Sequence, residues 1–111
     1  YHIDTPTKKV YAFDYAPDQP LTNRRVAIDL EDEDGFPDGM TKDRDGHVFI
    51  AHYAGSCLTR WNLETGEKLA HVEFPVSNPT CPILYEDRLL VTTAADGDDA
   101  EHAGAVFEVT Y

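Results

Sequence analysis

One short sequence pattern recurs three times along this 111-residue chain. In each copy a short apolar stretch leads to an aromatic residue that is followed by a polar one: KVYAFDY, CLTRWNL and GAVFEV. The aromatic positions, Phe13, Trp61 and Phe107, lie 48 and 46 residues apart. A further match, at an interval of 41 residues, pairs HVFIA with RLLVT. A repeat of this length indicates that similar supersecondary units stack on one another, because no single unit can bury its apolar face alone.

Each repeat unit is predicted to consist of β-strands. Short runs rich in Val, Ile, Thr, Tyr and Phe alternate with turn clusters, and no window carries an apolar stripe of helical period. Two of the clusters are typical of hairpin turns, in which Gly46 and Gly66 can adopt a positive φ. A period in the forties with about four strands per unit is the pattern of a β-propeller blade. The strands are expected at 9–15, 24–30, 47–52, 57–63, 68–74, 82–85, 88–93 and 105–110, with weaker candidates at 1–4 and 39–42.

The repeat therefore predicts an all-β, partial β-propeller of about two and a half blades, each a four-stranded antiparallel sheet. Residues 1–36 are expected to hold the later strands of one blade, 37–76 a complete blade, and 77–111 three strands of a further blade. Such an arrangement leaves open sheet edges and open blade faces. Either the missing blades of a longer propeller or self-association of several copies is expected to cover them.

The charge balance limits the classes of partner. Nine Lys and Arg oppose 21 Asp and Glu, which gives a formal net charge of −12. This charge disfavours nucleic acid and membrane surfaces as partners, and it fits either cation binding or a solvated acidic surface. No stretch has the length of a membrane span, and no signal peptide opens the sequence. Cys57 and Cys81 have no metal-type spacing; we expect them to be small apolar side chains of a cytoplasmic protein, with a disulfide as the alternative.

The order of motifs along the chain carries a family resemblance. IDTPTKKVYAFDY and LTNRRV precede the long stretch PDGMTKDRDGHVFIAHYAGSCLTRWNLETGEKLAHVEFPV, which NPTC, LLVTTA and AGAVFEV follow. This order resembles the C-terminal part of the SMP-30/gluconolactonase/regucalcin-like family. The resemblance implies a six-bladed propeller with a divalent metal, Ca²⁺ or Zn²⁺, in its central channel. It also implies metal-assisted hydrolysis of a sugar lactone or a similar ester.

Asp38 is the candidate site residue. On the residues alone, Pro-Asp-Gly is a common turn sequence. The resemblance gives Asp38 the role of metal ligand and of catalytic general base. The other two protein ligands of the family, a glutamate and an asparagine, have no counterpart in this sequence. Hydrolysis is therefore expected only where other blades or other chains complete the site. The alternative function is a noncatalytic β-repeat module that self-associates or binds a protein through its open sheet edges.

The remaining polar groups have simpler interpretations. The acidic run from Asp29 to Asp34 is interpreted as a solvated loop, and Asp96, Asp98 and Glu101 lack the spacing of a calcium loop. No nucleophile elbow or glycine-rich phosphate loop is present. The repeated aromatic residues are expected between blades. The five histidines are interpreted as surface or strand-packing residues, with His52 and Tyr53 facing the channel as the most interesting alternative: His2, His47, His52, His71 and His102.

Overall fold

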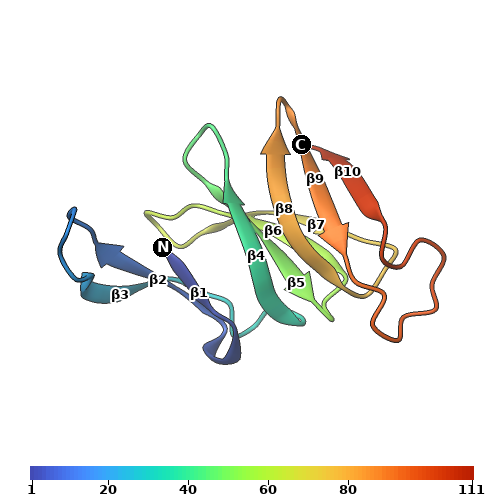
Figure 1. Cartoon of the computed structure of the whole chain (residues 1–111), viewed down its shortest axis with the longest axis horizontal. Helices are drawn as coiled ribbons and strands as arrows, with labels where there is room; N and C mark the ends of the chain where they lie inside the picture. The colour runs from blue at the N-terminus through green and yellow to red at the C-terminus, as the bar shows by residue number, and fades with distance from the viewer.

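Three antiparallel sheets stand side by side in the computed structural model, which describes residues 1–111 (Figure 1). The strand orders are β1-β2-β3 in the first sheet, β4-β5-β6-β7 in the second and β10-β9-β8 in the third. None of the helical segments is long and apolar enough to cross a membrane. The elements are β1 His2–Asp4, the 3-10 turn Thr5–Thr7, β2 Lys9–Asp14, β3 Thr22–Asp29, β4 Phe36–Lys42, β5 Val48–Tyr53, β6 Cys57–Trp61, β7 Lys68–Glu73, β8 Pro79–Tyr85, β9 Arg88–Thr93 and β10 Val106–Thr110.

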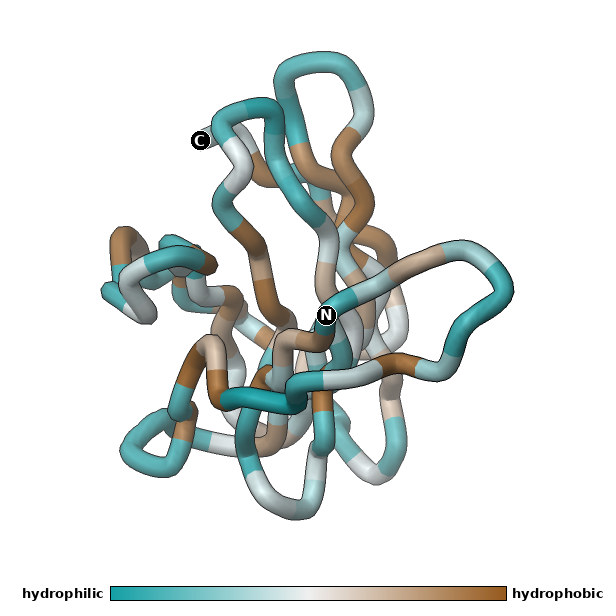
Figure 2. The backbone as a smooth tube through the Cα atoms, turned by 90° about the vertical axis from the view of Figure 1, so that its left-hand side faces the viewer, coloured by the Kyte–Doolittle hydropathy of each residue, from teal (hydrophilic) through white to brown (hydrophobic).

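Strands β5 and β6 of the second sheet are buried on both faces, because a neighbouring sheet covers each face. Successive side chains of a strand point to opposite faces, so β5 contributes to two cores at once. Val48 and Ile50 join a cluster with residues of the first sheet, whereas Phe49 and Ala51 join a cluster with residues of the third. In Figure 2 most of the outer loops are hydrophilic, and most of the apolar segments lie between them. The continuous apolar run of β5 is thus explained by double burial.

One edge strand of each sheet lies along the same side of the molecule. β4 contacts β8 on one side and β1 on the other, and the three lie in this order in Figure 1. The Thr5 hydroxyl donates a hydrogen bond of 2.8 Å to the carbonyl oxygen of Pro37, which joins the turn after β1 to β4. Each of these strands has only one hydrogen-bonded neighbour in its own sheet. β4 therefore links the second sheet to both of its neighbouring sheets.

The partial propeller predicted from the repeat is confirmed, with corrections at some strand ends. β4 begins at Phe36 rather than Gly39, and β8 begins at Pro79 rather than Pro82. Both strands contain a β-bulge near their start, which accommodates proline and glycine in a ladder that would otherwise exclude them. Conversely, the strand expected at 57–63 ends at Trp61. The two hairpin glycines do adopt a positive φ, as predicted.

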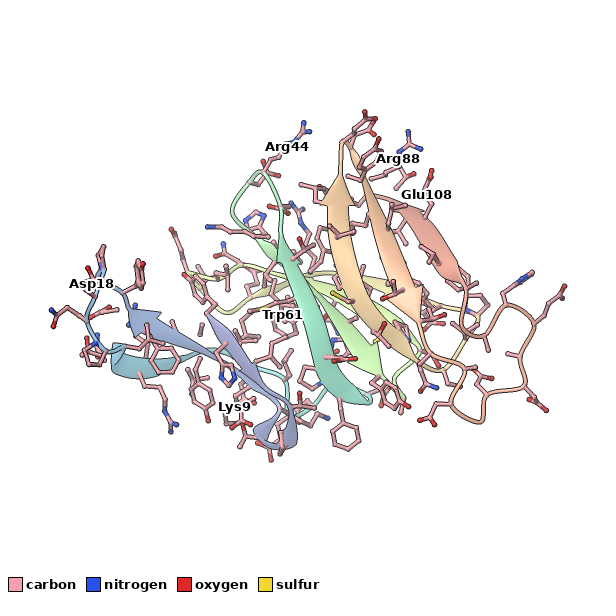
Figure 3. The ribbon with its side chains drawn as sticks, viewed as in Figure 1. Lys9, Asp18, Arg44, Trp61, Arg88 and Glu108 are labelled. Atoms are coloured by element: carbon pink, nitrogen blue, oxygen red, sulfur yellow. The ribbon has the colours of Figure 1, made fainter.

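The repeated aromatic residues pack mainly between sheets. Trp61 belongs to the cluster shared by the first and second sheets, and Figure 3 shows it in the interior between them. Phe107 packs against the second cluster and meets Phe74 edge to face, with 5.3 Å between ring centroids. The prediction is therefore confirmed for these two positions. Phe13, at the equivalent place in β2, is only half-buried, because the described chain has no sheet on that side.

Candidate functional site

Asp38 lies inside β4, at the bulge where that strand meets its neighbours. Pro37 pairs with His52 and Met40 pairs with Ile50, so two residues of β4 stand opposite one residue of β5. A bulge of this kind re-aims a side chain relative to the regular ladder. The sequence predicted Asp38 at the entry to the first strand of a blade. In the structure it lies within that strand, β4.

Gly39 allows β4 and β8 to approach closely beside Asp38. A Cβ atom at Gly39 would lie 2.7 Å from the sulfur of Cys81 and 2.7 Å from the carbonyl oxygen of Thr80. Any side chain here would therefore push the two strands apart. Together with the hydrogen bond from Thr5 to Pro37, this contact holds Asp38 where the three sheets meet.

The carboxylate of Asp38 is uncompensated within the chain. It is exposed, no ion pair or hydrogen bond engages it, and partial burial raises its pKa above the ordinary value. The pKa of Tyr53 is also raised, first by the hydrogen bond that its hydroxyl donates to Asp96, then by burial and by the charges of Asp96 and Asp38. The charges of Asp38 on β4 and Asp96 in the loop after β9 thus both act on the phenol of Tyr53.

The side chains of Asp38, Tyr53 and Asp96 are suited to bind a hard divalent cation as part of a larger ligand set. All of the donors are oxygen atoms, the kind that Ca²⁺ and Mg²⁺ prefer, and no cationic side chain competes for Asp38. Ca²⁺ takes six to eight oxygen ligands, so Asp38 supplies only one part of the coordination. No second carboxylate of the chain joins Asp38 in a group of three ligands.

A different acidic group occupies the turn between β4 and β5. Single ligand atoms of Asp43, Asp45 and His47 lie within 4.8 Å of one another. Arg60 donates to Asp43 from Nε at 2.8 Å and from Nη2 at 2.5 Å, and it also contacts Asp45 at 3.1 Å. The other oxygen of Asp43 accepts the backbone N–H groups of Asp45 and His47. Arg60 and the turn backbone therefore already engage both carboxylate oxygens of Asp43. The alternating pattern D-x-D-x-H was the sequence signal for it.

The other acidic residues considered from the sequence serve structural roles. Asp29 pairs with Lys9 at 3.1 Å, and Glu33, whose side chain is only 13% exposed, pairs with Lys68 at 2.6 Å. The acidic loop is thus tied to the sheets at both of these points instead of being fully solvated. Asp98 accepts hydrogen bonds from the backbone N–H groups of Ser77 and Ala100, which fixes the loop after β9.

The histidines separate into one buried residue and four partly or fully exposed ones. His52 is completely buried, with its Nε2 atom 2.7 Å from the Thr59 hydroxyl oxygen, which also accepts a 2.7 Å hydrogen bond from Trp61. Burial lowers the pKa of His52 and favours its neutral form. His52 is therefore part of the strand packing, whereas the next residue, Tyr53, is the one that reaches Asp96.

The two cysteines are free and differ in environment. Cys57 is buried as expected, and burial raises the pKa of its thiol to about 11. Cys81 is exposed on β8, so its interpretation as a buried apolar side chain was wrong. Cys81 lies on an edge strand, where its sulfur stands beside Gly39 of β4.

Curated proteins similar to this chain are longer than it is. Regucalcin of Gallus gallus is 37% identical over 120 residues, which cover 99% of this chain and 40% of that protein. An uncharacterized protein of Sulfolobus acidocaldarius is 34% identical over 103 residues, which cover 89% of this chain and 38% of that protein. The chain thus spans about 40% of the length of these relatives.

Solved structures and a family model agree with this similarity. A luciferin-regenerating enzyme superimposes with a TM-score of 0.89 at 27% identity, covering 100% of this chain and 40% of that one. A calcium-binding protein, regucalcin from Agrobacterium tumefaciens, superimposes with a TM-score of 0.83 at 27% identity, covering 96% and 40%. The model described as SMP-30/Gluconolactonase/LRE-like region matches residues 1–95. This chain therefore belongs to the SMP-30/gluconolactonase/LRE-like family.

Proposed function

We propose that this chain provides part of the active site of a metal-dependent lactone hydrolase, with Asp38 as one ligand of a divalent cation. The observation that carries the proposal is the uncompensated carboxylate of Asp38 on an edge strand of a family member. The site is complete only where further blades or another chain supply the remaining ligands. Sugar lactones are the proposed substrate class.

Calcium is the proposed cation, with Zn²⁺ as the alternative. The neighbourhood of Asp38 offers carboxylate and phenol oxygens, which are hard ligands. One similar solved structure is that of a protein described as calcium-binding. When bound, such a cation polarises a lactone carbonyl and lowers the pKa of water. Asp38 would hold the cation and accept a proton from the attacking water, while the hydrogen bond to Asp96 orients the hydroxyl of Tyr53.

The test is hydrolysis of gluconolactone by the purified chain with Ca²⁺ or Zn²⁺, compared with Asp38→Asn. We expect metal-dependent hydrolysis above the spontaneous rate from an assembled species, and a loss of at least about 100-fold in the variant, because the substitution removes the negative charge of the ligand and the proton acceptor. A chelator should abolish the wild-type activity in the same assay. Equal rates for wild type and variant would contradict the proposed role of Asp38.

The second candidate function is a noncatalytic module that binds through its open faces. Exposed apolar side chains on the third sheet favour it, since Ile83, Tyr85 and Val106 are 61%, 56% and 63% exposed. This function predicts assembly without hydrolysis under any of the metal conditions. The same assay therefore separates the two candidates once the molar mass of the tested species is known.

A further inference from the structure

The short segment before β8 joins two parts of the chain that lie beside Asp38. Tyr53 ends β5 and leads into the turn 54–56, and Asp96 lies in the loop that follows β9. The hydroxyl of Tyr53 donates a hydrogen bond to the carboxylate of Asp96, and the charge of Asp38 acts on the same phenol. Tyr53 and Asp96 therefore form a bridge between two sheets, and its position depends on how the turn and the loop are held.

Asn78 is hydrogen-bonded to both of these segments. Its side-chain carbonyl oxygen accepts a hydrogen bond of 3.1 Å from the backbone N–H of Ala54, the residue after Tyr53. Its side-chain amide donates a hydrogen bond of 3.3 Å to the carbonyl oxygen of Ala94, which shortly precedes Asp96. The backbone carbonyl of Asn78 accepts a further hydrogen bond of 2.9 Å from the N–H of Ala94. Asn78 is only 5% exposed, so these partners take the place of water at its amide.

The turn that Asn78 holds has an unfavourable backbone conformation. Ala54 and Ser56 have φ angles of +58° and +51°, in the left-handed region that is costly for residues with a side chain. The surrounding structure must compensate for this cost. The hydrogen bond from Ala54 to Asn78 does so, together with one of 3.1 Å from the N–H of Ser56 to the carbonyl oxygen of Ser77. Loss of the Asn78 amide would therefore remove a restraint directly after Tyr53.

The loop that carries Asp96 is held by the same segment on both sides of that residue. Before Asp96, Ala94 is bonded to the backbone and the side chain of Asn78. After it, the carboxylate of Asp98 accepts a hydrogen bond of 2.6 Å from the N–H of Ser77. Ser77 and Asn78 thus fix the turn after β5 and the loop after β9 relative to each other.

We propose that Asn78 is a positioning residue of the candidate site, because its buried amide holds the turn after Tyr53 and the loop of Asp96 so that the two side chains meet beside Asp38. This inference rests on the proposed function, in which Asp38 and the oxygen atoms near it bind a divalent cation. Substitution of residues that orient the ligands of a metal typically lowers its affinity by about 10- to 100-fold. A residue that only stabilised the two loops would not act through Tyr53 and Asp96.

The first test needs neither metal nor substrate. In metal-free protein with isotope-labelled tyrosine, the nuclear magnetic resonance signal of the ring carbon that carries the hydroxyl reports the hydrogen bond of Tyr53, and Tyr53→Phe identifies that signal. Asp96→Ala removes the acceptor and gives the signal of the free hydroxyl. We expect Asn78→Ala to move the signal at least halfway to that position. Asn62→Ala is the matched control, because Asn62 also accepts backbone N–H groups, in the turn after β6, and should leave the signal in place.

Asn78→Asp serves as the second variant where Asn78→Ala does not fold. It preserves the shape of the side chain and the acceptor for Ala54, but it places an oxygen in place of the amide group that donates to Ala94. This variant should also displace the Tyr53 signal. An unmoved Tyr53 signal in the folded variant, or an equal displacement in Asn62→Ala, would overturn the proposal.

Calorimetric titration of Ca²⁺ then connects the hydrogen-bonded pair to the site. Asn78→Ala should bind Ca²⁺ about 10-fold more weakly than the wild type does, whereas Asn62→Ala should bind it equally well. In a chain that already carries Tyr53→Phe and Asp96→Ala, Asn78→Ala should cause no further loss, because it acts through those two side chains. A loss of the same size in that chain would overturn the proposal. Equal affinity in wild type and Asp38→Asn would instead contradict the proposed function, while a displaced Tyr53 signal would still establish that Asn78 positions the pair.

Discussion

Replacement of Asp43 by alanine is expected to lower the free energy of unfolding by about 3 kcal/mol. The side chain of Asp43 is 1% exposed and that of Arg60 is 20% exposed, so the substitution leaves a partly buried guanidinium without its main partner. It also removes the acceptor for two backbone N–H groups in the turn between β4 and β5. Urea unfolding followed by circular dichroism measures the loss.

Asp45→Ala is the control for this prediction. Asp45 contacts the same guanidinium from a side chain that is 71% exposed, and exposed ion pairs contribute less than about 1 kcal/mol. A loss for Asp43→Ala that is no larger than the loss for Asp45→Ala would contradict the structural role assigned to the buried pair.

The same pair predicts how stability depends on pH. Burial alone would raise the pKa of Asp43, but its hydrogen bonds to Arg60 and to the turn backbone outweigh burial, and the pKa is lowered in the folded chain. As the pH falls, the unfolded chain therefore binds a proton at this position before the folded chain does. The contribution of Asp43 is complete above about pH 4 and is lost below it. The Asp43→Ala variant should consequently lose less of its remaining stability than the wild type between about pH 4 and pH 2.

Gly35→Ala is expected to lower the free energy of unfolding about as much as Asp43→Ala does, for steric reasons. Gly35 has a φ of +67°, and a Cβ atom there would lie 2.4 Å from the backbone nitrogen of Gly55 and 2.4 Å from the carbonyl oxygen of Tyr53. The left-handed conformation costs a non-glycine residue about 1–2 kcal/mol, and the overlap with backbone atoms adds about 1–3 kcal/mol. Thermal unfolding should show a loss of about 3 kcal/mol or more.

Gly97→Ala is the control that separates the conformational cost of a positive φ from the steric overlap. Gly97 has a φ of +81°, but no atom lies within 4 Å of the position of an added Cβ. This variant should lose only the conformational part, about 1 kcal/mol. Equal losses for the two variants would mean that the contact between Gly35 and the 53–55 segment does not constrain the fold.

The repeat and the period of two in the strands were sufficient to predict the architecture, because burial between sheets leaves a regular mark on the sequence. The starts of β4 and β8 could not be predicted in the same way. Pro37, Gly39 and Pro79 are poor strand residues, and only the bulges and the close approach of the two strands make them acceptable.

The candidate site was only partly predictable for a related reason. The PDGM motif identified Asp38, but the absence of an internal partner for its carboxylate depends on where every cation of the chain lies. The pairing of Asp43 with Arg60 likewise depends on the register of β5 with β6. His52 and Tyr53 are adjacent in β5 and have opposite environments, because successive side chains of a strand point to opposite faces.

Calorimetric titration of Ca²⁺ into the wild type and into Asp38→Asn is the most direct test of the central claim, that Asp38 is a ligand of a divalent cation. We expect saturable binding to the wild type, a large loss of affinity in Asp38→Asn, and unchanged binding in the control Asp45→Asn, because Asp45 lies in the other acidic group. Equal affinity in wild type and Asp38→Asn, or loss of binding in Asp45→Asn alone, would contradict the claim and would place any cation in the turn between β4 and β5.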